Sequence, residues 1–262
     1  QQTTLLQRRF VGFLNELQLK PSTEILDFLG VKTIISPPDH IITAIHEEDY
    51  ERVFTSSSGY ATVWSRNQHV SKARFVSSMI VVNPEGTLHF VQKGFFGLKK
   101  IQLSRDKNIL DYMLSARFDI SDQVLFDRAP SFERTSATPS QNTPHCGDEE
   151  ALEPREIAWI LDAPGLLKLC LFAPSDGFIV VAEQYHKNWR ATIDGVSAPV
   201  LRGNYVFLAI PVPAGLHELT LIFVPVEFYL GLWLALLGLV LLFYFLVIPA
   251  FKVKYSHRDE SF

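Results

Sequence analysis

A stretch without a single charged residue, from Phe228 to Phe251, constrains this chain more than any other feature of its sequence. It reads FYLGLWLALLGLVLLFYFLVIPAF and is 24 residues long, and roughly 20 apolar residues suffice for a helix to cross the hydrocarbon core of a bilayer. A buried helix of a soluble protein rarely runs so far without a charge. The sequence therefore predicts a transmembrane helix over 228–251.

The charges on either side of this span predict its direction. Lys252, Lys254 and Arg258 follow it closely, whereas the twenty residues before it contain no Lys or Arg. By the positive-inside rule, the tail 252–262 is cytoplasmic and the preceding chain is extracytoplasmic. We therefore expect a cell-membrane protein with its main domain outside; a tail-anchored protein with a cytoplasmic domain would invert this asymmetry.

The first residues, QQTTLLQRRFVGFLNELQL, contain no continuous apolar segment typical of a signal peptide. Their apolar side chains recur at helical spacing instead, which predicts an amphipathic helix or connector over 1–22. We expect export to depend on something upstream, either a removed signal peptide or the earlier spans of a multi-pass protein.

Composition excludes some function classes. The net charge is −4, and the absence of a basic stripe argues against a nucleic-acid partner. His145 and Cys146 have no second pair at ligand spacing, so no metal site is predicted. An oxidising exterior would permit a disulfide between Cys146 and Cys170, but two unrelated thiols are the default interpretation.

The predicted fold class is α+β and mostly β. We expect an antiparallel, β-sandwich-like extracytoplasmic domain followed by one C-terminal transmembrane helix. Residues 23–132 mix short helices with strands, and 133–155 is rich in Ser, Thr, Pro and acidic residues, which predicts a linker or an exposed loop. Residues 156–226 form a run of short strands separated by turns, which predicts an antiparallel β module.

Within this module, the segment WRATID alternates, with Trp189, Ala191 and Ile193 expected on a core face. Asp194–Gly195 is a strong signal for a two-residue hairpin turn, because type I′ turns need positive φ at both central positions. We expect further turns at Gly203–Asn204 and at 213–215.

The residues from Gly177 to Pro225 resemble the C-terminal extracytoplasmic region of the YfhO family of bacterial membrane proteins. The family pattern Tyr-x-x-x-Trp-Lys/Arg-Ala-x-Val/Ile-Asp-Gly, then Leu-Arg-x-Asn-Tyr-x-Phe, then Val-Pro-x-Gly-x-His, is matched from Tyr185 to His217, and a terminal span beginning GLW follows. The earlier part of the chain resembles the family more loosely, with Lys72 standing where Pro is usual.

This resemblance implies a polytopic glycosyltransferase of the GT-C type, which takes a sugar from a polyprenyl-phosphate carrier for cell-envelope glycosylation. The catalytic carboxylate of such enzymes lies in an early extracytoplasmic loop. The resemblance thus implies a non-catalytic portion, partnered by an upstream transmembrane bundle, the bilayer, and a polyprenyl-phosphate sugar or an envelope glycan. The alternative is a single-pass, membrane-anchored β-sandwich binding module with no enzymatic role.

A carbohydrate site combines aromatic platforms with planar hydrogen-bonding groups, and the β module holds such types close together. The candidate ligand-binding residues are Tyr185, Trp189, Arg190, Arg202, Asn204 and Tyr205. Structural roles compete with this hypothesis: Trp189 shares the face of Ala191 and Ile193, and Arg202 could pair with Asp194 across a hairpin. The sequence predicts no catalytic residue and no cofactor.

Overall fold

The computed structural model describes residues 23–37, 50–57, 59–66, 71–82, 87–91, 98–102, 112–113, 117–127, 130, 146 and 153–256. The described residues are mostly β-strand, in largely antiparallel sheets, and β5 pairs with β8 in parallel. The chain divides into two compact units, Gln1–Ile222 and Phe223–Phe262. The predicted class, a mostly β chain with a C-terminal apolar helix, is confirmed.

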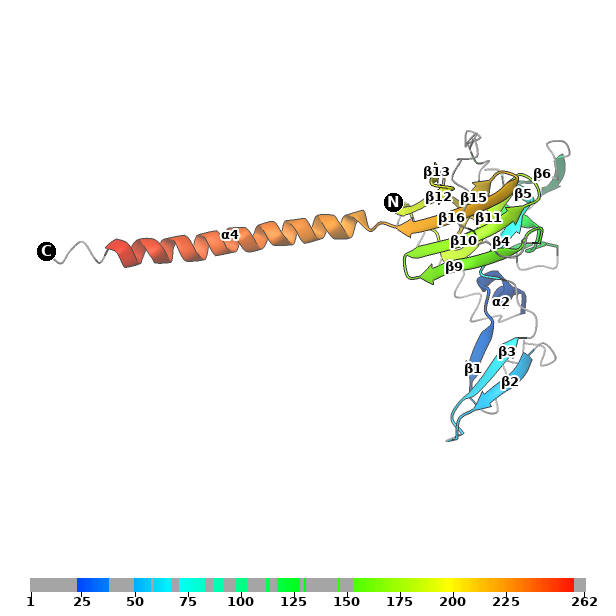
Figure 1. Cartoon of the computed structure of the whole chain (residues 1–262), viewed down its shortest axis with the longest axis horizontal. Coiled ribbons are helices and arrows are strands. Elements are labelled where there is room, and N and C mark those ends of the chain that lie inside the picture. Colours follow the sequence, from blue (N-terminus) through cyan, green and yellow to red (C-terminus); the bar gives the residue numbers. More distant parts are fainter. Residues whose placement is uncertain are drawn as a thin grey trace. The chain divides into compact units, whose positions relative to one another are not determined.

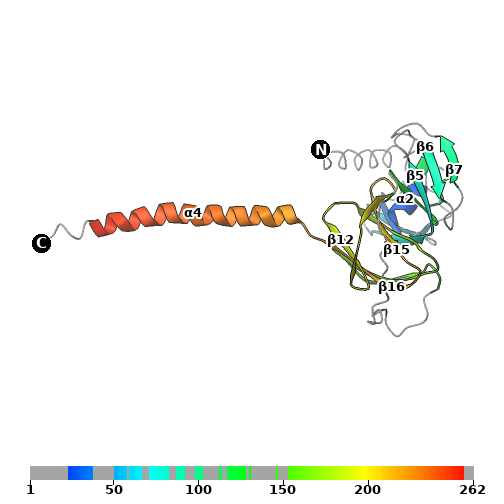
Figure 2. The ribbon, with the colours of Figure 1, turned by 90° about the horizontal axis from the view of Figure 1, so that it is seen from above.

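Two sheets form the sandwich of the first unit (Figure 1, Figure 2). The five-stranded sheet has the order β13-β12-β16-β10-β9, with strands at Ile157–Ala163 (β9), Leu166–Ala173 (β10), Trp189–Ile193 (β12), Val196–Ala198 (β13) and Gly215–Phe223 (β16). The four-stranded sheet has the order β14-β15-β11-β4, with strands at Ala73–Val76 (β4), Gly177–Gln184 (β11), Leu201–Gly203 (β14) and Phe207–Val212 (β15).

The four-stranded sheet is buried on both faces, as its nearly continuous apolar strands require. In β11, Phe178 and Val180 belong to a core cluster that also contains Phe28. Ile179 and Val181 alternate with them and are fully buried, so they lie on the opposite face, toward the five-stranded sheet. The sheet is therefore the middle layer of the unit.

Strand β4 pairs with β11 along its whole length, from Phe178↔Val76 to Val181↔Ala73. It comes from the segment 23–132 but completes a sheet whose other strands come from 156–226. The two predicted segments thus share one sheet and one core, while the boundaries assigned to them stay predictions.

The described residues of the first unit also form a three-stranded sheet, a second four-stranded sheet and a short helix (Figure 1). Their orders are β1-β3-β2 and β7-β6-β5-β8. The bounds are Thr23–Leu29 (α2), Thr33–Ser36 (β1), Tyr50–Thr55 (β2), Thr62–Arg66 (β3), Ser78–Val82 (β5), Thr87–Val91 (β6), Leu98–Gln102 (β7) and Gln123–Phe126 (β8). Gly30, at φ +64°, ends α2 as a C-terminal glycine should.

The turns of the β module follow the prediction with one shift. Asp194 and Gly195 have φ of +50° and +79°, as the predicted type I′ hairpin requires. The second turn lies one residue later than predicted, because the positive φ values fall on Asn204 (+45°) and Tyr205 (+70°), while Gly203 still belongs to β14.

Cys146 and Cys170 form a disulfide, with their Cα atoms 5.7 Å apart. The default interpretation of two unrelated thiols is therefore wrong. The bond joins the predicted linker to β10, at a position where Cys170 is buried. The spacing of the two cysteines could not show this, because nothing in the sequence places the linker beside this strand.

The second unit contains helix α4, Val226–Ser256. Its part Val226–Phe245 is long and apolar enough to cross a membrane, and no other helix in the described ranges meets that test. This agrees with the predicted membrane association. The predicted N-terminal helix over 1–22 and the last residues of the predicted cytoplasmic tail, 257–262, lie outside the described residues, as does most of the predicted linker.

Candidate functional site

Trp189, the aromatic centre of the predicted carbohydrate site, lies in the core. It is 7 % exposed, and Ala191 and Ile193 on the same face of β12 are also buried, which confirms the core face predicted from alternation. Its indole N–H donates to the backbone carbonyl of Gln184 at 3.2 Å. Both the ring and its polar atom thus have structural contacts.

Asn204 and Tyr205 hold the β14–β15 turn against β8. Asn204 is fully buried, and its side-chain oxygen accepts the backbone N–H of Leu125 at 2.8 Å. In return, the backbone N–H of Asn204 donates to the Leu125 carbonyl, also at 2.8 Å. Tyr205 is 9 % exposed and belongs to the core cluster around Phe28.

Arg202 pairs with Asp127 and not with Asp194. Its Nη2 lies 2.6 Å from Asp127 Oδ2. The predicted pairing with Asp194 is wrong because the two residues belong to different sheets: Arg202 lies in β14 of the four-stranded sheet, whereas Asp194 follows β12 of the five-stranded sheet. Asp194 contacts His217 instead, at 2.7 Å between Oδ2 and Nδ1.

Among the six candidates, Arg190 is exposed, and Tyr185, like Arg202, is half-buried. Arg190 is exposed, and its Nη1 donates to the carbonyls of Lys187 and Trp189 at 2.8 and 3.0 Å. Tyr185 is half-buried, and its backbone N–H donates to the carbonyl of Val206 at 2.7 Å. The six candidates thus lie on neighbouring segments, but three of their side chains, those of Trp189, Asn204 and Tyr205, face inward.

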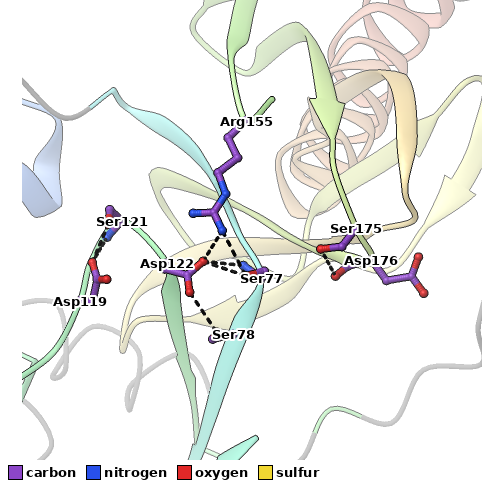
Figure 3. Close-up of polar contacts among 8 residues, drawn as sticks. All are labelled: Ser77, Ser78, Asp119, Ser121, Asp122, Arg155, Ser175 and Asp176. Atoms are coloured by element: carbon purple, nitrogen blue, oxygen red, sulfur yellow. Dashed lines mark hydrogen bonds and ion pairs between the residues drawn. The ribbon is translucent and has the colours of Figure 1, made fainter. Parts of the chain in front are cut away.

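A separate polar cluster, which sequence reasoning missed, surrounds Asp122 (Figure 3). Ser77 Oγ donates to Asp122 Oδ1 at 2.7 Å, and Ser78 Oγ donates to Oδ2 at 3.1 Å. Arg155 adds an ion pair, with Nη2 at 2.8 Å from Oδ1. These residues come from three distant segments, so no local spacing could have indicated the cluster.

The surroundings of Asp122 favour its charged form. Burial alone would raise its pKa, but the hydrogen bonds from Ser77 and Ser78 and the charge of Arg155 outweigh burial and lower it. Both oxygens of this carboxylate already accept from Ser77, Ser78 and Arg155, which suits it to joining segments of the chain. The other contacts in Figure 3, Asp119 with Ser121 and Ser175 with Asp176, are local to their own turns.

Within the described residues, no group of three or more His, Cys, Asp or Glu side chains could hold a metal ion. The polar residues of the β module and the Asp122 cluster make hydrogen bonds and ion pairs. Most of these bonds join strands or turns to each other. Of the six candidates, Arg190 has an exposed side chain, and Tyr185 and Arg202 are half-buried.

Comparison with known proteins agrees with the motif in the β module. Searches of curated proteins and of solved structures give no significant match. One family model matches residues 173–235, which include β11 to β16 and the first part of α4. Over these residues the resemblance predicted from the motif is confirmed, and the matched family is the one described as bacterial membrane protein YfhO.

Proposed function

We propose that this chain is the extracytoplasmic C-terminal portion of a YfhO-like polytopic membrane protein. We further propose that the whole protein is a glycosyltransferase that uses a polyprenyl-phosphate sugar donor for cell-envelope glycosylation. The observation that carries the proposal is the family match, which extends from the β module into the apolar helix α4.

The contacts in the β module support a non-catalytic role for this portion. A general acid or base needs a titratable group that can reach substrate. Asp122 and Asp194 instead accept several hydrogen bonds that join separate segments of the domain. The side chains of Trp189 and Asn204 are likewise occupied in packing and in backbone contacts.

Two independent features support the proposed orientation. The disulfide between Cys146 and Cys170 fits an oxidising compartment, because such bonds rarely persist in the cytosol. Lys252 and Lys254 follow the apolar stretch, and positive charges concentrate on the cytoplasmic side of spans. Both features favour the first unit outside the membrane and the C-terminus inside.

Within this proposal, contact with a polyprenyl-phosphate sugar or an envelope glycan falls mainly to Tyr185 and Arg190. An aromatic ring and a guanidinium suit the apolar face and the hydroxyl rim of a sugar. Trp189, Asn204 and Tyr205 have no part in this contact, because their side chains are buried.

The first test is the intact size of the native protein, detected in its own membranes with an antibody to the first unit. A band several times larger than 29.7 kDa would support a polytopic parent. A band near that mass would contradict it and would favour the alternative, a single-pass anchored binding module without enzymatic activity.

Two further measurements test orientation and activity. A fluorescent protein fused after Phe262 should fluoresce, and alkaline phosphatase fused there should be inactive, if the tail is cytoplasmic. Cells lacking the gene should lose a specific sugar from an envelope polymer or glycolipid. An unchanged envelope glycan profile would contradict the transferase proposal while leaving the orientation untouched.

A further inference from the structure

Helix α2 and strands β3 and β4 bring two arginines and one aspartate together beneath the surface. Asp27 belongs to α2, Arg66 ends β3, and Arg74 lies in the middle of β4 (Figure 1 labels these elements). The exposed fractions of the Asp27 and Arg66 side chains are 18 % and 10 %, and Arg74 is 6 % exposed. The group therefore holds one more positive than negative charge in a largely buried setting.

Both carboxylate oxygens of Asp27 bind Arg66. The two form a bidentate ion pair, in which Arg66 Nη1 bonds Asp27 Oδ1 and Arg66 Nη2 lies 3.4 Å from Oδ2. This fork-to-fork geometry uses both carboxylate oxygens. Arg66 Nε is left buried and without a hydrogen-bond acceptor among the described residues.

Arg74 has no acceptor at all in the described part of the chain. Its Nε, Nη1 and Nη2 are all buried and unpaired. On β4 it stands opposite Val180, on the face that packs toward Phe28, and its Cζ lies 5.8 Å from the centre of the Phe28 ring. Burial lowers the pKa of Arg74 to about 10, although the Asp27 charge acts to raise it, so the group stays charged at neutral pH.

A buried charge without a partner is one of the costliest features a fold can carry. Nearly all buried polar groups are satisfied, so each exception calls for an explanation. Here four nitrogens, one from Arg66 and three from Arg74, remain as donors without acceptors. The aromatic rings of Tyr50 and Phe28 lie 5.9 and 5.8 Å from the two guanidinium carbons.

We propose that Arg66 and Arg74 form a binding site for an oxyanion of the phosphate class at the junction of α2, β3 and β4. The excess positive charge selects an anion, and guanidinium groups match the geometry of phosphate oxygens. A phosphate group offers more acceptor oxygens than a carboxylate, which suits a site with four unpaired nitrogens. Because these nitrogens lack contact with solvent, access requires neighbouring side chains to move apart.

The experiment compares thermal unfolding of the full chain in sodium phosphate and in sodium chloride at equal ionic strength and pH. A ligand that binds the folded state raises the unfolding midpoint in proportion to its occupancy. Phosphate should raise the midpoint of the wild type progressively with concentration. Arg74→Met should bind phosphate about tenfold more weakly, because it removes charge-assisted hydrogen bonds. Arg52→Met, which removes an exposed guanidinium from β2, should bind phosphate as the wild type does.

The proposal is overturned if the wild type has equal midpoints in phosphate and chloride and is also not stabilised by phosphatidic acid in nanodiscs. An undiminished phosphate effect in Arg74→Met would overturn it as well. Arg74→Lys, which keeps the charge but loses the fork, serves if Arg74→Met fails to fold, and it too should bind phosphate more weakly. Experiments in nanodiscs distinguish a soluble phosphate ligand from the phosphate headgroup of a lipid. Stabilisation by free phosphate in neutral-lipid discs indicates a soluble ligand, and stabilisation only by phosphatidic acid in the disc indicates a lipid headgroup.

Discussion

The imidazole of His217 and the carboxylate of Asp194 form a pair that joins the β12–β13 turn to β16, with Nδ1 and Oδ2 2.7 Å apart. Both side chains are 12 % exposed. Asp194 Oδ1 also accepts the backbone N–H of Glu218 at 2.8 Å, and its own N–H donates to the Glu218 carbonyl at 2.9 Å. One aspartate thus fixes both the left-handed turn and its position on the neighbouring strand.

Replacing Asp194 by Ala should lower the free energy of unfolding by about 1–3 kcal/mol, because it leaves buried donors on His217 and Glu218 unsatisfied. Asp194→Asn is the matched control. It keeps an oxygen that can accept the Glu218 N–H, so the loss should be smaller. Chemical denaturation followed by tryptophan fluorescence measures both, and equal stability of Asp194→Ala and the wild type would contradict the structural role.

The disulfide between Cys146 and Cys170 closes a loop with a sequence separation of 24. Reducing it should lower the free energy of unfolding by about 3 kcal/mol, because the open chain has more unfolded conformations. The unfolding midpoint should therefore fall when a reductant is added. A Cys146→Ser/Cys170→Ser variant should have the lower midpoint already and should not respond to reductant. Alkylation of two free thiols in the unreduced native protein would show that the bond does not form.

The acid limb of the stability curve should depend on Asp122. The pKa of this carboxyl is lowered in the folded protein because hydrogen bonds and Arg155 outweigh burial. A depressed folded pKa means that the contribution is fully present above the unfolded value, about 3.9, and is lost as the pH falls through the folded pKa. The stability difference between the wild type and Asp122→Asn should thus be present at pH 7 and shrink under strongly acidic conditions.

Denaturation of both proteins at a series of pH values measures this difference. Asp162→Asn is a suitable control, because that carboxylate is more exposed and lies far along the chain, paired with Lys72. A difference between wild type and Asp122→Asn that stays constant down to the lowest pH would show that the charge of Asp122 contributes nothing.

The local features of the fold could be predicted from the sequence. The uncharged run identifies α4, the alternation in WRATID identifies the buried face of β12, and Asp194–Gly195 identifies its turn. Each of these signals depends on residues that are close together in the chain, where side-chain periodicity and backbone preference act directly.

The long-range pairings could not be predicted in this way. Strand β4 pairs with β11, β5 pairs in parallel with β8, and Cys146 forms a disulfide with Cys170. The local sequence pattern of each of these segments does not indicate which other segment it pairs with. The prediction of contacts within the candidate site was wrong for the same reason. Without the sheet order, Arg202 could be assigned to Asp194, whereas the structure gives it Asp127.

Substitution of Trp189 tests most directly whether a candidate site residue packs in the core or binds ligand. Its side chain is 7 % exposed, and its indole N–H bonds Gln184. Trp189→Ala should lower the free energy of unfolding by about 3–5 kcal/mol, since it removes a large buried ring and leaves a cavity. Arg190→Ala, on the adjacent exposed position, should change stability by less than about 0.5 kcal/mol.

Binding of envelope glycan fragments to the same two variants completes the test. If Arg190 contacts the glycan, Arg190→Ala should weaken binding at unchanged unfolding midpoint, whereas Trp189→Ala should weaken binding only through loss of folded protein. A Trp189→Ala variant with the wild-type unfolding midpoint and no glycan binding would reverse the assignment, because the ring would then act on the ligand and not on the core.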